Sequence, residues 1–234
     1  MKPIPFIDMP CQDALSFAPV DEGFVEIGAY SDGQILTDMK YFAAGRPGAL
    51  PVAFVRKEVA DRLLYAATLL PKGHRLKVYD AWRPFSVQKS LYDEYFDLLK
   101  QEKPQLSEVE LHREARTFVS FPDATLPFSF VHSSGGAVDL TVVDEGCEEL
   151  DMGCPFDDFS DRATVYALES TPCEARENRR LLYSVMTEAG FTSYASEWWH
   201  YDYGDRFWAA LTGNAVLYPS EYEATALPLY AIPF

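Results

Sequence analysis

Hydrophobic residues recur at helical spacing in several stretches of the chain. Leucines and alanines three and four positions apart predict a helix over residues 56–70, which Pro71 and Gly73 should end. The same spacing predicts four further helices, of which the third should end at Gly190 because glycine is the common residue after a helix. These four cover residues 86–100, 107–119, 174–189 and 205–211.

Shorter stretches alternate between apolar and polar residues, which is typical of strands. Residues 75–80 read as a half-buried strand, and residues 137–143 as a strand rich in β-branched side chains. Turn residues at 31–33 between two aromatic-rich segments predict a hairpin of strands over 24–30 and 36–42. A strand pair is also expected on either side of Ser196, its second member over 198–203, with an acidic loop over 151–161 and peripheral segments over 1–22 and from 218 onward.

Length and composition fit one folded domain over residues 1–234. The chain is 48% hydrophobic and 15% aromatic, enough to bury a large core. Its net charge of -16 should repel phosphate backbones and anionic lipids, so nucleic acid is not an expected partner. The longest apolar run, residues 63–70, is too short to span a bilayer, so no membrane span is expected. The sequence leaves the oligomeric state open.

Cysteine usage and the start of the chain bear on the compartment. Four cysteines in a chain of this length make no disulfide scaffold, so free thiols are expected, with a Cys147–Cys154 bridge as the alternative. No uninterrupted apolar segment follows Lys2, because two prolines and an aspartate interrupt it. We expect a cytoplasmic protein, or a periplasmic one if a natural leader precedes this sequence.

Two polar clusters carry the candidate chemistry. His132 and Asp139 lie seven positions apart across Gly135-Gly136, and both residue types bind divalent metals. The segment 197–200, Glu-Trp-Trp-His, supplies a third ligand in His200. A histidine beside aromatic residues is more often a core residue than a ligand. This chain has only four histidines, however, and two of them lie in these clusters with a carboxylate close by.

Three protein ligands would leave a fourth position open, as catalytic zinc sites do. His132, Asp139 and His200 make such a set, and Glu197 could then act as the general base. Positions three apart in a regular strand face opposite sides, so we expect a bulge or bend at Glu197-Trp198. Arg83, at the end of the strand over 75–80, lies where sites are often built, although a lone strand-end arginine is more often a solvated charge.

Together these motifs resemble the zinc D-alanyl-D-alanine dipeptidases, the VanX-type enzymes of peptidase family M15. His132-x6-Asp139 and Glu197-Trp198-Trp199-His200 carry the resemblance, and the segment 80–84, Asp-Ala-Trp-Arg-Pro, matches the family's Asp-Gly-Tyr-Arg-Pro. The likeness runs from about residue 36 to 203. It implies an α+β fold of the hedgehog and DD-peptidase type, with helices packed on a mainly antiparallel sheet.

The resemblance also assigns roles to single residues. It implies one zinc ion per chain held by His132, Asp139 and His200, with Glu197 as catalytic base for metal-activated water and Arg83 stabilising the tetrahedral intermediate. Asp157 looks like the carboxylate that binds the substrate's ammonium group, and Asp158 is the alternative because the loop length differs slightly. The family's serine two residues before the first histidine is Phe130 here, which leaves the detailed substrate contacts open.

The implied activity is hydrolysis of D-alanyl-D-alanine to two D-alanines. An alternative within the same group is a DD-carboxypeptidase or another cell-wall peptidase, which would need an open cleft. A third hypothesis is a zinc-binding module without activity, and the presence of both Glu197 and Arg83 argues against it. The sequence leaves open the physiological role, the choice of divalent metal and the tolerance for other dipeptides.

Overall fold

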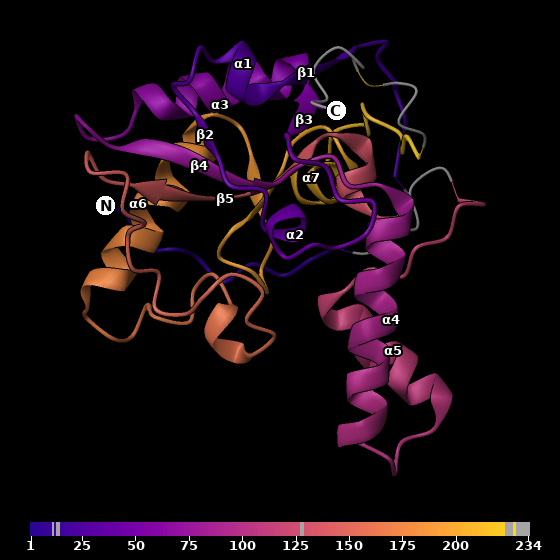
Figure 1. Ribbon diagram of the computed structural model, residues 1–234. Helices are drawn as coiled ribbons and strands as arrows, with labels where there is room; N and C mark the ends of the chain where they lie inside the picture. Colours follow the sequence, from indigo (N-terminus) through magenta and orange to yellow (C-terminus); the bar gives the residue numbers. More distant parts are fainter. Residues whose placement is uncertain (11, 13–14, 127–128, 223–226, 228–234) are drawn as a thin grey trace.

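A central five-stranded sheet organises the computed structural model, which describes residues 1–10, 12, 15–126, 129–222 and 227 (Figure 1). The strand order is β2-β4-β5-β7-β6, and every neighbouring pair is antiparallel except β2 and β4. The remaining strands, β1 and β3, form a separate antiparallel pair. The bounds are β1 Phe24–Glu26, β2 Leu36–Thr37, β3 Phe54–Arg56, β4 Arg75–Asp80, β5 Ala137–Val143, β6 Thr192–Ser193 and β7 His200–Asp202.

The described residues form seven α-helices and two short 3-10 helices around these strands. The predicted α+β class and the mainly antiparallel sheet are therefore confirmed. The helices are α1 Ile27–Tyr30, α2 Lys40–Ala43, α3 Lys57–Thr68, α4 Phe85–Glu102, α5 Glu108–Phe118, α6 Glu174–Glu188 and α7 Arg206–Thr212, with the 3-10 helices η1 Val131–Ser134 and η2 Asp161–Ala163.

The main core lies between one face of the sheet and helices α3 and α6. Leu140 of β5 is fully buried in it, with Leu63 from α3 and Leu182 from α6 in the same cluster. Because side chains alternate along β5, its residue Asp139 points to the other face. The sheet therefore separates an apolar face that stabilises the fold from a face that presents polar groups.

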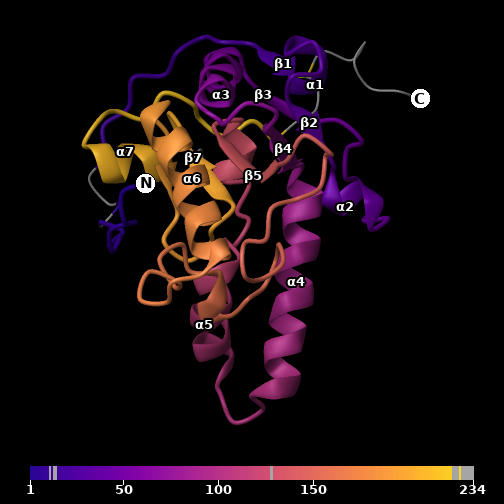
Figure 2. The same ribbon diagram turned by 90° about the vertical axis from the view of Figure 1, so that its left-hand side faces the viewer.

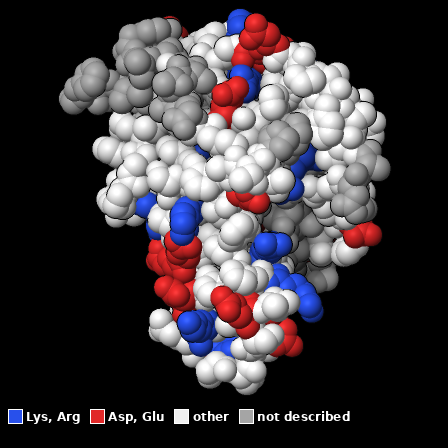
Figure 3. All heavy atoms as spheres, turned by 90° about the vertical axis from the view of Figure 1, so that its right-hand side faces the viewer, with Lys and Arg blue, Asp and Glu red and all other residues white. Residues whose placement is uncertain are grey.

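Helices α4 and α5 form a hairpin that extends away from the sheet in two perpendicular views (Figures 1 and 2). Ser107 caps α5 in a capping box with Glu110, and the two helices share a second apolar cluster. Acidic and basic side chains are interspersed over the lower part of the face in Figure 3. Two of the pairs within the hairpin are Lys89–Asp93 and Lys103–Glu114.

A register shift in β4 brings Asp80 to the polar face of the sheet. Val78 lies opposite Leu140, but Asp80 lies opposite Asp139, so one residue of β4 is passed over between them. Without this irregularity Val78 and Asp80 would share a face, because alternate residues of a strand point the same way. The shift therefore places the buried carboxylate of Asp80, at the end of β4, beside that of Asp139 on β5.

The hairpin expected over residues 24–42 is wrong. The chain does not continue as a strand after Glu26. The Glu26 carboxylate accepts hydrogen bonds from the backbone N–H groups of Gly28 and Ala29, and this cap starts α1. Strand β1 then pairs with β3, while β2 pairs with β4, so the two segments join different sheets. A side-chain cap outweighed the strand propensity of the aromatic residues.

The ends of the chain contact the rest of the protein where they are described. The backbone oxygen of Glu221 accepts a hydrogen bond from the Trp82 indole, and its backbone N–H donates to the oxygen of Ser133. Of the peripheral tail expected from residue 218 onward, residues 223–226 and 228–234 lie outside the described residues.

Cys147, Cys154 and Cys173 are free thiols, so the alternative Cys147–Cys154 bridge is wrong, and Cys11 lies outside the described residues. Within the described ranges, none of the helices is both long enough and apolar enough to cross a bilayer.

Candidate active site

The 3-10 helix η1 fixes His132 because the two following glycines permit a sharp turn into β5. Gly135 ends η1 with a φ of 74°, in the left-handed region that glycine adopts without strain. At Gly136 an added Cβ would lie 2.3 Å from the backbone oxygen of Tyr203, so only glycine lets these segments approach. His132 is buried and points toward the polar face of β5.

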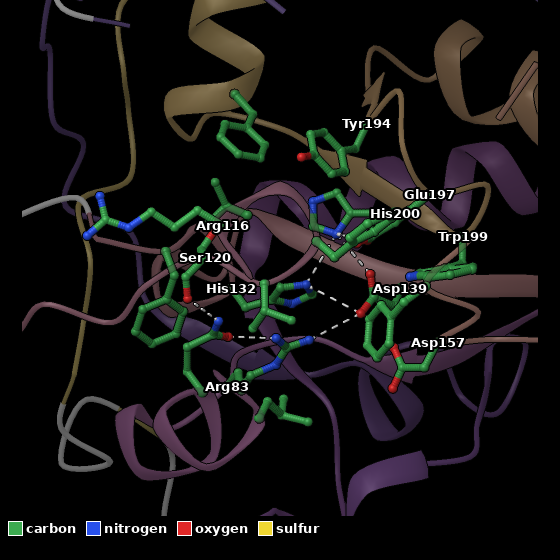
Figure 4. Close-up of a pocket in the computed structure, with 18 of the residues that line it drawn as sticks. Arg83, Arg116, Ser120, His132, Asp139, Asp157, Tyr194, Glu197, Trp199 and His200 are labelled. Carbon is green, nitrogen blue, oxygen red and sulfur yellow. Dashed lines mark hydrogen bonds and ion pairs between the residues drawn. The ribbon is translucent and has the colours of Figure 1, made fainter. Parts of the chain in front are cut away.

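The register between β5 and β7 brings the other two predicted ligands together. Asp139 lies directly opposite His200, and its Oδ1 is 2.9 Å from His200 Nδ1. His132 Nε2 is 3.3 Å from Asp139 Oδ2 and 3.2 Å from His200 Nδ1 (Figure 4). All three residues are buried, and among the described residues they form the group whose ligand atoms lie within 4.8 Å of one another.

Outer hydrogen bonds orient both imidazole rings with a free nitrogen toward this point. His132 Nδ1 lies 2.8 Å from the backbone oxygen of Ala81, and His200 Nε2 lies 2.8 Å from Asp202 Oδ1. Because both partners only accept, these nitrogens carry the protons. In the neutral rings the lone pairs of His132 Nε2 and His200 Nδ1 therefore face each other and Asp139, an arrangement that a cation would stabilise.

The donor set fits zinc. Neighbouring ligand atoms at the corners of a zinc tetrahedron are ~3.3 Å apart, given metal–ligand distances of about 2.0 to 2.2 Å. The distances above are close to that value. Burial alone would lower the pKa of His200, but Asp202 and Asp139 outweigh it and raise that pKa well above its ordinary value. The surrounding carboxylates thus favour positive charge at His200, where a metal ion would replace a proton.

Glu197 lies just outside this triad. The bend expected at Glu197-Trp198 lies one residue later, at Trp198-Trp199, and β7 begins only at His200. Glu197 Oε2 is therefore on the same side as His200 and 3.8 Å from its Nδ1. Burial raises the pKa of Glu197 to about 8, opposed by His200 and assisted by the nearby carboxylates. The side chain lines the same pocket as the three convergent residues.

Arg83 enters the pocket from the end of β4 and is fixed by three acceptors. Its Nε donates to Asp80 Oδ2 at 2.7 Å, its Nη1 to Gln88 Oε1 at 2.7 Å, and its Nη2 to Asp139 Oδ2 at 3.3 Å. Only 7% of the residue is exposed. Burial by itself would lower the pKa of Arg83, but Tyr41 and the two carboxylates raise it above the usual value, so the guanidinium stays charged.

Asp157 and Asp158 point to different surroundings. Asp157 lines the pocket, where its Oδ1 accepts a hydrogen bond from the Tyr41 hydroxyl at 3.3 Å. Its φ of 59° lies in the left-handed region, which aspartate adopts more readily than most residues other than glycine. Burial, together with the Asp139 charge, raises the pKa of Asp157 to about 7 despite Arg83. Asp158 instead pairs with Arg162 at 2.5 Å.

The empty space of the pocket, counted together with open solvent at its mouth, amounts to about 600 Å³. Phe130 lines one wall and packs against Phe85, so the position of the family's serine is apolar here. The pocket also contains Tyr41 and Gln88, which the sequence did not single out.

Asp202, whose carboxylate accepts a hydrogen bond from His200 Nε2, is another residue of the site that the sequence did not single out. It lies two positions after His200 on the same strand and is fully buried. Strand alternation puts residues two apart on one face, so the spacing alone could have identified it.

The comparisons with known proteins agree on one family. A model described as Peptidase_M15, D-ala-D-ala dipeptidase, matches residues 46–222. A D-alanyl-D-alanine dipeptidase of Enterococcus faecium is 31% identical over 62% of this chain and 70% of its own. One from Synechocystis is 28% identical over 88% and 89%, and one from Escherichia coli is 36% identical over 56% and 55%.

Two solved structures are similar at lower sequence identity. A vancomycin resistance D,D-pentapeptidase VanY in complex with Zn(II) aligns with a TM-score of 0.42 and 18% identity over 71% of this chain and 83% of that one. VanYB in complex with D-alanine-D-alanine gives a TM-score of 0.43 and 18% identity over 70% and 81%.

A buried cluster of two imidazoles and a carboxylate lies beside a fixed arginine in a pocket on an α+β scaffold, and such a cluster could hold a metal ion next to a bound ligand. The chain belongs to the D-Ala-D-Ala dipeptidase family of M15 peptidases, because the family model covers most of it. The hydrolase and dipeptidase predictions are thus confirmed at the level of the family.

Changing any one of the three convergent residues is expected to lower the metal content. We expect His132→Ala, Asp139→Ala and His200→Ala each to purify with far less than one zinc per chain, because two ligands hold zinc poorly. Elemental analysis of the purified proteins measures this, with His74→Ala, remote from the pocket, as the matched control. Full zinc occupancy in all three variants would contradict the ligand assignment.

Asp202→Ala tests the outer support of His200 and should lower zinc affinity by roughly 10- to 100-fold, the usual effect of removing such a partner. Competition with a chelator measures that affinity. An unchanged zinc affinity would mean that Asp202 does not orient the ring.

Proposed function

We propose that this protein is a zinc-dependent dipeptidase that hydrolyses D-alanyl-D-alanine to two D-alanines. The convergence of His132 Nε2, His200 Nδ1 and the Asp139 carboxylate at separations of 2.9 to 3.3 Å is the observation that carries the proposal. These residues would hold one zinc ion per chain. When bound, zinc supplies Lewis acidity that polarises the scissile carbonyl and lowers the pKa of water.

Glu197 moves the proton in this proposal. Its buried carboxylate lines the pocket and reaches within 3.8 Å of His200 Nδ1, so it lies near the reacting atoms. It accepts a proton from the attacking water and returns it to the leaving amine. Burial raises the pKa of this carboxyl group above its ordinary value, and the positive charge of a bound zinc ion would oppose that rise and favour the ionised form that acts as base.

Arg83 stabilises the oxyanion that forms at the carbonyl carbon. A guanidinium has five N–H donors, and three of them are used by Asp80, Gln88 and Asp139. The remaining donors are available to the developing negative charge. Because the surrounding acceptors already fix the group, little reorganisation is needed during the reaction.

Asp157 binds the free ammonium group of the dipeptide. Its carboxylate is buried within the pocket, and it has one polar neighbour in the Tyr41 hydroxyl. A substrate ammonium would form a charge-assisted hydrogen bond there. A blocked amino group would instead leave the carboxylate buried without its partner. This supports a preference for a free dipeptide over longer cell-wall peptides.

The amino group of the substrate tests this preference. N-acetyl-D-Ala-D-Ala should be cleaved at least ~30-fold less efficiently than D-Ala-D-Ala, because removing one partner of a buried charge pair costs ~2 to 5 kcal/mol. Measurement of kcat/KM for both substrates gives the ratio. Equal cleavage of the free and the acetylated substrate would contradict the dipeptidase proposal and favour an open-cleft cell-wall peptidase.

The Asp157→Asn variant should reduce the ratio of kcat/KM between D-Ala-D-Ala and N-acetyl-D-Ala-D-Ala, because it selectively slows cleavage of the free dipeptide. Asparagine tolerates the same positive φ, so the backbone should be unchanged. Asp158→Asn is the matched control, because Asp158 faces Arg162 instead of the pocket. If Asp158→Asn reduces the ratio and Asp157→Asn does not, Asp158 is the residue that binds the substrate ammonium group.

A further inference from the structure

Gln88 is a buried amide in the first turn of α4 whose two ends are both used. Its Oε1 accepts a hydrogen bond from Arg83 Nη1 at 2.7 Å, and its Nε2 donates to the backbone oxygen of Ser120 at 2.7 Å. Only 2% of the residue is exposed. Figure 4 shows the resulting chain of hydrogen bonds from the guanidinium through the amide to the pocket wall.

The contact with Arg83 adds a third hydrogen bond to the two by which the carboxylates hold the guanidinium. Asp80 binds Nε and Asp139 binds Nη2, so Gln88 is the partner that binds Nη1. Three acceptors on three nitrogens determine the plane of the guanidinium. A neutral acceptor suits this place, since two buried carboxylates already face a single positive charge and a third would be left uncompensated.

The contact with Ser120 connects α4 to the opposite part of the pocket. Ser120 follows α5, and it lines the pocket together with Phe118 and Val119. A glutamate at position 88 could still accept from Arg83, but its carboxylate could not donate to the Ser120 oxygen. The amide therefore meets both requirements, an acceptor toward Arg83 and a donor toward the wall, whereas a carboxylate meets only the first.

We propose that Gln88 is a positioning residue that holds the Arg83 guanidinium in the plane where its free N–H groups face the reacting carbonyl. The proposal rests on the function proposed for Arg83 in hydrolysis of the dipeptide. Gln88 itself contacts neither the three convergent residues nor Asp157 through any hydrogen bond that the structure describes. Its effect should therefore appear in the chemical step and not in metal binding.

The Gln88→Met variant removes both hydrogen bonds while keeping the side chain's length. Its kcat should fall by roughly tenfold to a hundredfold, the usual effect of losing a hydrogen bond to a charged group, with little change in KM. Zinc content should remain at the wild-type level. Gln101→Met, at an exposed glutamine of the same helix, is the matched control and should match wild type in kcat.

A double-mutant cycle separates positioning from a structural role. In an Arg83→Lys background the guanidinium is absent, so Gln88→Met should lower kcat by less than ~3-fold further, close to the scatter of such cycles. An equal loss in both backgrounds would overturn the proposal and make Gln88 a packing residue.

Two further measurements keep this result distinct from failure of the proposed function. Wild-type protein that does not hydrolyse D-Ala-D-Ala would refute the dipeptidase itself, whatever Gln88 does. Calorimetric binding of a phosphinate analogue of the D-Ala-D-Ala tetrahedral intermediate gives a readout without turnover. Gln88→Met should weaken the phosphinate about as much as it lowers kcat, and unchanged affinity would overturn the positioning role.

Discussion

Replacing Glu197 by glutamine is expected to leave zinc bound and to remove nearly all hydrolysis of D-Ala-D-Ala. Glutamine keeps the shape of the side chain but cannot take a proton from water or return one to the leaving amine. Loss of a general base typically lowers the rate by ~10² to 10⁴. The metal should remain because the convergent ligand atoms belong to His132, Asp139 and His200, and Glu197 lies outside that group.

The measurement pairs kcat for D-Ala-D-Ala with zinc content by elemental analysis. Glu188→Gln, at an exposed glutamate on α6, provides the matched control and should behave as wild type in both. Activity within a few fold of wild type in Glu197→Gln would assign the base to another group. A variant that loses zinc together with activity would instead make Glu197 a ligand.

Most long elements could be predicted from the sequence because their periodicity is strong and local. The strands Arg75–Asp80 and Ala137–Val143 have the predicted bounds, and the helices over 57–68 and 174–188 agree within two residues at each end. The short elements near the N-terminus could not be predicted in this way. There one glutamate cap started a helix where the apolar pattern favoured a strand.

The convergence of His132, Asp139 and His200 could be predicted from motifs, but the pairing that produces it could not. It depends on Asp139 lying opposite His200 and on the register shift that brings Asp80 alongside. Both are long-range properties of the sheet that no local pattern encodes. The position of Gln88 is a similar case, because a glutamine near the start of an amphipathic helix carries no signal of its distant partners.

Arg83→Lys is expected to lower kcat for D-Ala-D-Ala by ~10² to 10³ with little change in KM. Lysine keeps the positive charge between Asp80 and Asp139 but lacks the planar fork that donates to three acceptors and to the oxyanion together. Losing one oxyanion donor has an effect of this size in other hydrolases. An interaction made only in the transition state lowers kcat and kcat/KM equally.

Stability distinguishes the charge of Arg83 from its geometry. Arg83→Met leaves Asp80 buried without its paired cation, which should lower the free energy of unfolding by about 3 to 5 kcal/mol, whereas Arg83→Lys should keep most of that stability. Urea unfolding of both variants gives these free energies. For the kcat measurement, the control is Arg180→Lys, because Arg180 lies on α6 and forms an ion pair with Glu169. If Arg83→Lys raises KM and leaves kcat unchanged, Arg83 acts in substrate binding, and the oxyanion must be stabilised by another group.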